Sequence, residues 1–534
     1  MSVYVAEDFT AEETDVLRRY VTNLDGPVFA LVNLPEVVKG ALFARYSRSG
    51  KSLRRLLLDE FVGDLDISGD RTVDATVGLA RAEQLYDRVF FEYGDDSVAQ
   101  LGGVHLACEQ ASNLLTKVLE RGRLMAYLEQ STRYVAYDGR LGGRFRYHRD
   151  PHVLASPLGP RYVADMDRLF ETYASLVTVV QGWCRERYPK EPADSDLVYR
   201  RAVRAKALDA VRGVLPAAAL ANVGIYGSGQ AYEALLLRLR AHPLPEARHY
   251  GDLMLTELRK VIPSFLTRVD VADRGVAWSE YLQGTRQAMA AMAATLATDA
   301  VPEEAPEVAL VDFDPEGEEK LLAAMLYPYV AVPEPQLRRR VAELSAEERS
   351  ALVAAYVGQR GNRRHKPGRA LERTSYRFDV CSDYGAFRDL QRHRMLTVEW
   401  QSLSPRHGYV LPQAVVEAGC HELFEEAMDR SADLHDALAE RFPDQAAYAV
   451  SLAYRIRYSL QLNAREAMHV LELRTSPQGH PSYRRVCQQM HRLIATEAGH
   501  HAVAAMMGFV DHSQPPLERL AAERRAERRR CGGG

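Results

Sequence analysis

The chain has 534 residues, more than one hydrophobic core usually supports, so two or more domains are expected. Its hydrophobic fraction of 47% and charged fraction of 26% are ordinary for a soluble globular protein, and its net charge of −4 argues against nucleic-acid binding over the whole surface. The six cysteines form no Cys-x-x-Cys pair, which excludes the usual zinc and disulfide patterns. Because it shows no apolar signal segment and no apolar run of membrane length, the sequence predicts a cytoplasmic protein.

The first landmark along the chain is an apolar, strand-like run that begins at Phe29 and turns helical at Pro35. Its Ala-Leu-Val phrase at residues 30–32 returns in the second half of the chain, at residues 309–311. Both copies are followed within a few residues by Pro-Glu and a helical pattern. A repeat over such a distance indicates an internal duplication.

A second landmark repeats at nearly the same interval. Residues 121–134 read RGRLMAYLEQSTRY, and residues 391–407 read QRHRMLTVEWQSLSPRH. Arg121 and Arg123 fall where Arg392 and Arg394 do. If the later copy carries two extra residues, Ser131, Arg133 and Tyr134 match Ser404, Arg406 and His407. Guanidinium and hydroxyl groups in this number suit a phosphate, which an arginine fork binds bidentately. The alternative interpretation is a solvated surface strand and turn.

The domain boundary is visible in composition. Residues 273–296 form a helical pattern that closes the first half, and residues 297–306, ATDAVPEEAP, are small, acidic and Pro-containing, as in a linker. We therefore expect modules at residues 1–296 and 307–515. Residues 516–534 are Arg-rich and predict a solvated helical tail that frays, with nucleic-acid binding as a weaker alternative.

The clearest chemical phrase is residues 463–475, NAREAMHVLELRT. On a helix, Arg465 and His469 lie one turn apart on one face, so the phrase predicts a polar stripe, or else a solvated helix with an Arg–Glu pair. In the first half the corresponding stretch is RGVLP at residues 212–216, followed by a helical run that ends at Arg240. The interval from Arg240 to Arg474 is shorter than the one between the two earlier landmarks, so an insertion is expected in the first half before this helix.

These phrases resemble the motifs of the flavin-dependent thymidylate synthases. The family signature is Arg-His-Arg, two residues, Ser, then Ser-x-Arg-Tyr; the second copy keeps its front at Arg392, and the first keeps its back at Ser131. Residues 463–474 resemble the family's Asn-Ala-Arg helix, and residues 212–216 resemble its Arg-x-Val-Leu-Pro motif. The family's folate-binding histidine would fall on Asp95 or Pro367, and His365 lies two residues upstream of the latter.

The resemblance implies an α+β fold with two homologous modules, each a sheet flanked by long helices. It implies an FAD-dependent methyltransferase acting on C5 of a pyrimidine nucleotide, with methylenetetrahydrofolate and NADPH as possible co-substrates and a homodimer of four modules. FAD would be held by Arg392, His393, Arg394, Asn463, Arg465 and His469. A dUMP- or UMP-like nucleotide would be held by Ser131, Arg133, Tyr134, Arg212, Arg240, Ser404 and Arg406, and Arg474 would act on the pyrimidine.

The two halves have lost complementary parts of the family's motifs. Flavin-type residues survive in the second half, whereas Ser131, Arg133 and Arg212 survive in the first, which predicts one composite site built by both. Two alternatives stay open. The same scaffold could serve another nucleotide or carbon donor, or both halves could keep only the fold in a non-catalytic binding protein.

Overall fold

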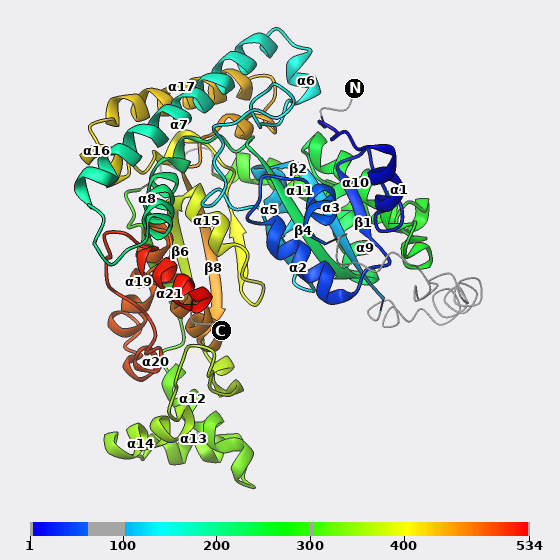
Figure 1. The fold of residues 1–534 in the computed structure, drawn as a ribbon. Coiled ribbons are helices and arrows are strands. Elements are labelled where there is room, and N and C mark those ends of the chain that lie inside the picture. Colours follow the sequence, from blue (N-terminus) through cyan, green and yellow to red (C-terminus); the bar gives the residue numbers. More distant parts are fainter. Residues whose placement is uncertain (1–3, 62–101, 298–302, 532–534) are drawn as a thin grey trace. The chain divides into compact units, whose positions relative to one another are not determined.

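The structure, a computed structural model, describes residues 4–61, 102–297 and 303–531. The chain forms two compact units, whose elements are labelled in Figure 1. Unit 1 consists of Met1–Ala174, Leu215–Pro302 and Arg430–Val450, and unit 2 of Ser175–Val214, Glu303–Asp429 and Ser451–Gly534. Each half of the sequence therefore contributes one internal segment to the unit that is otherwise built by the other half.

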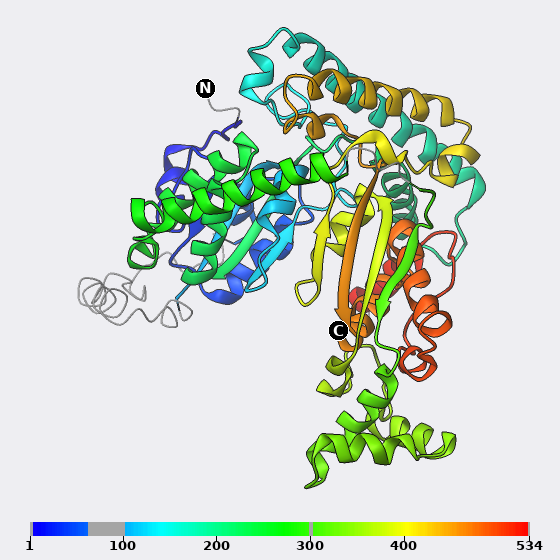
Figure 2. The same cartoon turned by 180° about the vertical axis from the view of Figure 1, so that it is seen from behind.

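Each unit contains one antiparallel sheet of four strands. In unit 1 the order is β1 (Val28–Leu31), β2 (Gly103–Ser112), β4 (Leu220–Ser228) and β3 (Met125–Glu129). In unit 2 it is β5 (Val308–Phe313), β6 (Ser375–Asp383), β8 (Arg455–Asn463) and β7 (Thr397–Trp400). The strand order is the same in both, and both sheets are visible from behind in Figure 2. The predicted α+β fold with two modules of one type is confirmed.

Most of the helices lie within one of the two units. Those of unit 1 are α1 (Ala11–Leu17), α2 (Glu36–Tyr46), α3 (Leu53–Glu60), α5 (Asn113–Leu119), α6 (Pro151–Leu154), α9 (Gly229–Arg240), α10 (Pro245–Leu258) and α11 (Ala277–Leu296). Those of unit 2 are α8 (Asp196–Val211), α12 (Gly317–Leu326), α13 (Glu334–Ala342), α14 (Ala346–Val357), α15 (Tyr384–Leu390), α16 (Gln413–Glu417), α18 (Ala464–Arg474), α19 (Pro481–Thr496), α20 (His501–Met506) and α21 (Leu520–Cys531). The division into units falls within α7 (Gly159–Arg187) and α17 (His421–Ala439).

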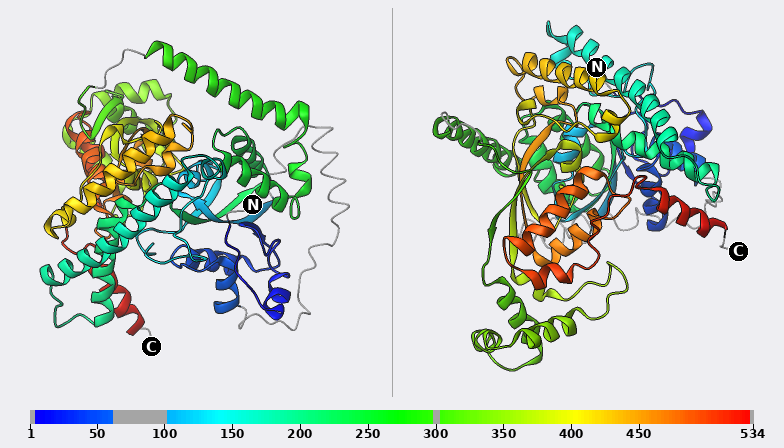
Figure 3. Two further views of the ribbon diagram at one scale, coloured as in Figure 1. Left: turned by 90° about the horizontal axis from the view of Figure 1, so that it is seen from above. Right: turned by 90° about the vertical axis from the view of Figure 1, so that its left-hand side faces the viewer.

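The alternation of buried and more exposed side chains explains why the sheet of unit 2 is covered on one face. In β8, Ile456, Tyr458, Leu460 and Leu462 are buried and alternate with more exposed residues. A strand with this period of two presents one apolar face to a core. Helices α18 and α19 pack against the strands of this sheet (Figure 3). In unit 1, α9 and α10 play the corresponding role against β4 and β1.

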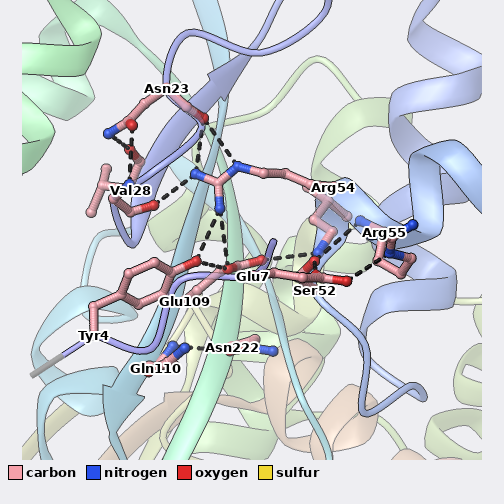
Figure 4. Close-up of polar contacts among 12 residues, drawn as sticks. Tyr4, Glu7, Asn23, Val28, Ser52, Arg54, Arg55, Glu109, Gln110 and Asn222 are labelled. Atoms are coloured by element: carbon pink, nitrogen blue, oxygen red, sulfur yellow. Dashed lines mark hydrogen bonds and ion pairs between the residues drawn. The ribbon is translucent and has the colours of Figure 1, made fainter. Parts of the chain in front are cut away.

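A buried ion pair fastens the N-terminal part of unit 1 (Figure 4). The guanidinium of Arg54, on α3, lies 3.5 Å from a carboxylate oxygen of Glu109, on β2, and both side chains are almost fully buried. Arg54 also donates to the backbone carbonyls of Asn23 and Gly26, and Tyr4 donates to Glu109. Because every charge here has partners, the network joins a terminal segment, a helix and a strand without leaving a buried charge unpaired.

Several local expectations are confirmed. The strand-like run at residue 29 is β1, its repeat at residue 309 is β5, and the pattern that closes the first half is α11. The insertion predicted in the first half is visible as the extra helix α8, since only α16 and α17 lie between β7 and β8. The predicted linker at residues 297–306 lies partly outside the described residues. Among the described helices, none has the length and apolarity that a membrane span requires.

The Arg-rich C-terminal segment differs from the expected frayed tail. Helix α21 packs against α8, and Arg524 makes a two-bond ion pair of 2.6 and 2.8 Å with Asp194, which is buried. Arg524 also binds Glu191 at 2.6 Å. The helix itself agrees with the predicted helical tail. Its contacts with α8, Asp194 and Glu191 were not expected, because a run of like charges gives no sign of acidic partners that are distant in sequence.

Candidate functional site

Two histidines and a glutamate form the centre of a polar cluster in unit 2. His393 lies in the turn between α15 and β7, whereas Glu466 and His469 are on α18, and their ligand atoms all lie within 4.8 Å of one another. His393 is buried, and its Nε2 accepts a hydrogen bond of 2.8 Å from Nε of Arg474. The last residue of α18 is thereby fixed against the turn that precedes β7.

Burial and positive charge keep both imidazoles neutral. Burial lowers the pKa of His393 well below its usual range, and Arg474 and His469 add to the effect. Burial, followed by the charge of Lys366, lowers the pKa of His469 to about 4. The opposite happens at Glu466, where burial raises the pKa to about 7 despite Lys366 and Arg465. Near neutral pH the cluster therefore presents two neutral rings and a carboxyl that titrates.

The three groups have the chemical types of a metal site, but their surroundings favour an anion. Two imidazoles and a carboxylate are common ligands of divalent transition metals. However, Lys366, Arg363 and Arg474 all lie close enough to lower the pKa of His469. A divalent cation would add two more charges to this positive field, whereas the phosphates of a nucleotide cofactor would reduce it.

A second cluster, next to the first, gathers three guanidinium groups on one carboxylate. Arg212 and Arg474 each lie 3.6 Å from an oxygen of Asp389, and Arg392 donates a hydrogen bond to it. Asp389 and Arg212 are largely buried. Arg212 comes from the end of α8, and the other three from the region of α15 and α18. Residues from both halves of the sequence thus meet inside unit 2.

The remaining FAD residues predicted from the sequence lie around the first turn of α18. Asn463 is the N-cap of this helix, and its side-chain oxygen accepts from the backbone N–H of Glu466 at 2.9 Å. Arg465 is partly exposed and donates to the Pro367 carbonyl at 3.3 Å, with Glu372 at 3.4 Å. Arg394 is exposed and contributes to the electrostatic field at Glu466. All six predicted residues therefore belong to unit 2.

The predicted nucleotide residues are divided between the units. Ser131, Arg133 and Tyr134 follow β3 in unit 1, where the Arg133 N–H donates to the Ser131 hydroxyl at 3.2 Å. Tyr134 is exposed and lies under the guanidinium of Arg48. Arg240 forms an ion pair of 3.0 Å with Asp252, also in unit 1.

Three other nucleotide residues lie in unit 2. Arg212 belongs to the cluster on Asp389. Ser404 precedes a short 3-10 turn, and Arg406 is an exposed residue within it. Of the predicted nucleotide residues, the structure therefore brings Arg212 into contact with the site around Arg474.

The structure shifts one equivalence between the halves. Ser228 is the N-cap of α9 as Asn463 is the N-cap of α18, and each is the last residue of an inner strand of its sheet. This match differs by one position from the sequence alignment that pairs Arg240 with Arg474. The counterpart of Arg465 is therefore Gln230, and that of Arg474 is Leu239. Strands β4 and β8 both have nine residues, so the two N-caps that end them occupy equivalent positions.

Sequence reasoning missed Asp389 and Lys366. An acid three residues before Arg392 is a signal for a helical ion pair, but it does not reveal that two further arginines converge on it. The histidine considered for folate, His365, has its ring nitrogens next to the Gly361 N–H and the Asn362 amide at 3.2 and 3.1 Å. The other candidate position, Asp95, lies outside the described residues.

This chain is similar to known proteins over most of its length. A "UPF0159 protein" of Chlamydia muridarum is 40% identical over 97% of this chain and 98% of its own length, and one of Chlamydia pneumoniae is 39% identical over 98% of both. A "UPF0159 protein" of Thermoplasma acidophilum is 31% identical over 91% of this chain and 97% of its own.

Among solved structures, a UMP/dUMP methylase, PolB from Streptomyces cacaoi bound with 5-Br dUMP, aligns at 18% identity with a TM-score of 0.30. The alignment covers 38% of this chain and 97% of that one. The model of the family "Thymidylate synthase complementing protein" matches twice, at residues 50–264 and at residues 309–498. With one match in each half of the sequence, this chain belongs to the thymidylate synthase complementing protein family.

Proposed function

We propose that this protein is an FAD-dependent methyltransferase that acts on C5 of a pyrimidine nucleotide, dUMP or UMP. The observation that carries the proposal is the cluster in which Arg212, from the first half, meets Arg392 and Arg474, from the second, on Asp389. The cluster supports a composite site in which each half supplies the residues that the other has lost. The family membership gives the class of reaction.

The residues around α18 fit FAD by their chemistry. The neutral ring of His469 can exchange hydrogen bonds with a flavin, and the partly exposed Arg465 and Arg394 can pair with its diphosphate. When bound, FAD would supply the electron and hydride chemistry of the reaction. The protein's own contribution is to position the reactants and to balance charge.

Arg474 is proposed to face the pyrimidine. Its Nε is held by His393 and its Nη1 lies 3.6 Å from Asp389, so its orientation is fixed before a ligand binds. A fixed guanidinium stabilises the negative charge that develops on the ring when C5 acts as a nucleophile. Arg212 and Arg392 are proposed to hold the phosphate. Methylenetetrahydrofolate as carbon donor, NADPH as reductant and a homodimer complete the proposal.

The visible spectrum of the purified protein tests flavin binding. The wild type is expected to carry FAD, and Arg465→Ala is expected to lose most of it, since a charge-assisted hydrogen bond contributes about 1.5–3 kcal/mol. Arg394→Ala is expected to lose FAD as well, and Arg123→Ala is its matched control, because Arg123 is the first-half counterpart of Arg394. Transfer of label from methylenetetrahydrofolate to dUMP or UMP then tests the reaction. A wild-type protein that binds neither FAD nor nucleotide would refute the proposal.

A further inference from the structure

Unit 1 has a cavity at the place where unit 2 has its histidine cluster. The cavity has a volume of about 470 Å³ and lies between the start of β3, helix α9 and the start of α11. Aligning the N-caps Ser228 and Asn463 shows why there is space. Small or neutral side chains replace charged and titratable ones. Gln230 is the counterpart of Arg465, Ala231 of Glu466 and Ala234 of His469.

The cavity is rich in cationic side chains. Arg123, Arg238, Arg268 and Arg274 line it together with one acid, Glu233. Glu233 is paired with Arg268 at 2.9 Å, and among the described lining residues the arginines outnumber the acids. Among the described residues, Nε and Nη2 of Arg238 are buried and have no hydrogen-bond partner. Buried guanidinium nitrogens without an acceptor are costly, and an anion in the cavity would supply one.

An aromatic ring stands at the edge of the same cavity. Trp278, in the first turn of α11, lines the cavity and is 55% exposed. The π-helical turn Ala272–Val276 precedes it and brings Arg274 to the cavity. Gly275 is required in this turn, because a Cβ there would lie 2.1 Å from the Val269 carbonyl oxygen. Such π-turns occur frequently at functional sites.

We propose that this cavity of unit 1 binds a nucleoside monophosphate, with Arg238 and Arg274 on the phosphate and Trp278 stacked on the base. Bidentate arginines recognise phosphate, and an exposed indole offers a face on which a planar base can stack. The volume lies at the lower end of the range for small-molecule sites, which suits a mononucleotide better than a dinucleotide such as FAD. The site is separate from the nucleotide site proposed around Arg474 in unit 2.

Equilibrium dialysis with UMP and the fluorescence of Trp278 together test the proposal. Full-length wild type is expected to bind UMP in unit 1 with a change in fluorescence that Trp278→Phe abolishes. Arg238→Gln is expected to weaken this binding at least tenfold. Arg248→Gln is the matched control in the same unit, because Arg248 donates to the backbone carbonyls of His242 and Pro243 and does not line the cavity; it is expected to bind as the wild type does.

Two further arms separate the possible ligands and sites. Uridine and inorganic phosphate are each expected to bind at least tenfold more weakly than UMP; equal binding of phosphate would overturn recognition of a nucleotide. Arg474→Ala should remove any UMP bound by unit 2 and leave the Trp278 signal unchanged. Trp278→Ala changes an exposed side chain and is expected to fold. It therefore tests stacking on the indole ring even if Arg238→Gln does not fold. Unchanged UMP affinity in both variants, or no UMP binding sensitive to either, would refute the proposal.

Discussion

Asp389 pairs with three guanidinium groups of the site proposed in unit 2. We expect Asp389→Asn to lower the free energy of unfolding by about 3–5 kcal/mol, because it leaves largely buried arginines facing one another without a counter-charge. Urea unfolding measures the change. Asp312→Asn is the control, since its 3.1 Å pair with Arg377 is about half exposed and should contribute less than about 1 kcal/mol. Equal effects of the two changes would contradict this role of Asp389.

Glu466 and His469 are expected to give stability opposite dependences on pH. The pKa of Glu466 is about 7 in the folded state against an ordinary 4.5, so the stability that its protonated form contributes is lost as the pH rises between these values. The pKa of His469 is about 4 against 6.5, so the stability that its neutral form contributes is lost as the pH falls between those values.

Two variants separate these contributions. Relative to wild type, Glu466→Gln should gain stability as the pH rises from about 4.5 to about 7, by on the order of 3 kcal/mol. His469→Asn should gain stability as the pH falls from about 6.5 to about 4. Urea unfolding at a series of pH values gives both differences. If the two differences had the same sign, the assigned pKa directions would be wrong.

At the scale of single elements, Asn463 has two separable roles. Its side chain caps α18, and it is also proposed to contact FAD. Asn463→Ala should lower the free energy of unfolding by about 1 kcal/mol, whereas Asn463→Ser should change it by only a few tenths, because serine also caps. Both are expected to weaken FAD binding. Ser228→Ala in α9 should show the same loss of stability with no loss of FAD, and retention of FAD by Asn463→Ser would contradict the contact.

Helices and strands were the part of the molecule most open to prediction. Alternation of apolar residues marks β8, and the Asn-Ala-Arg phrase marks the start of α18, because caps and periodicity are local properties. The docking of α21 on α8 and the approach of Arg212 to Asp389 depend on contacts between distant segments. No local pattern encodes them. The one-residue shift at Ser228 was missed for a similar reason, since only the strand pairing fixes the register.

At the scale of the whole molecule, the two halves of the sequence are expected to depend on each other. Unit 2 includes Ser175–Val214 from the first half, and unit 1 includes Arg430–Val450 from the second. Residues 1–296 and 307–534 produced separately should therefore fail to fold, because each lacks a segment that belongs to its core. Produced together, they should associate and co-purify. Independent cooperative unfolding of each separate half, measured by circular dichroism, would contradict this expectation.

The same exchange of segments has a consequence for synthesis on the ribosome. Most of unit 1 has been made by residue 302, but its last segment, Arg430–Val450, is completed much later. At roughly 5–20 residues per second, the incomplete unit waits for roughly 7–30 s. Apolar surface that the late segment covers, such as that around Ala446 and Tyr448, stays open during this interval. The nascent chain is therefore expected to need a chaperone that binds unit 1 while the ribosome synthesises residues 303–450.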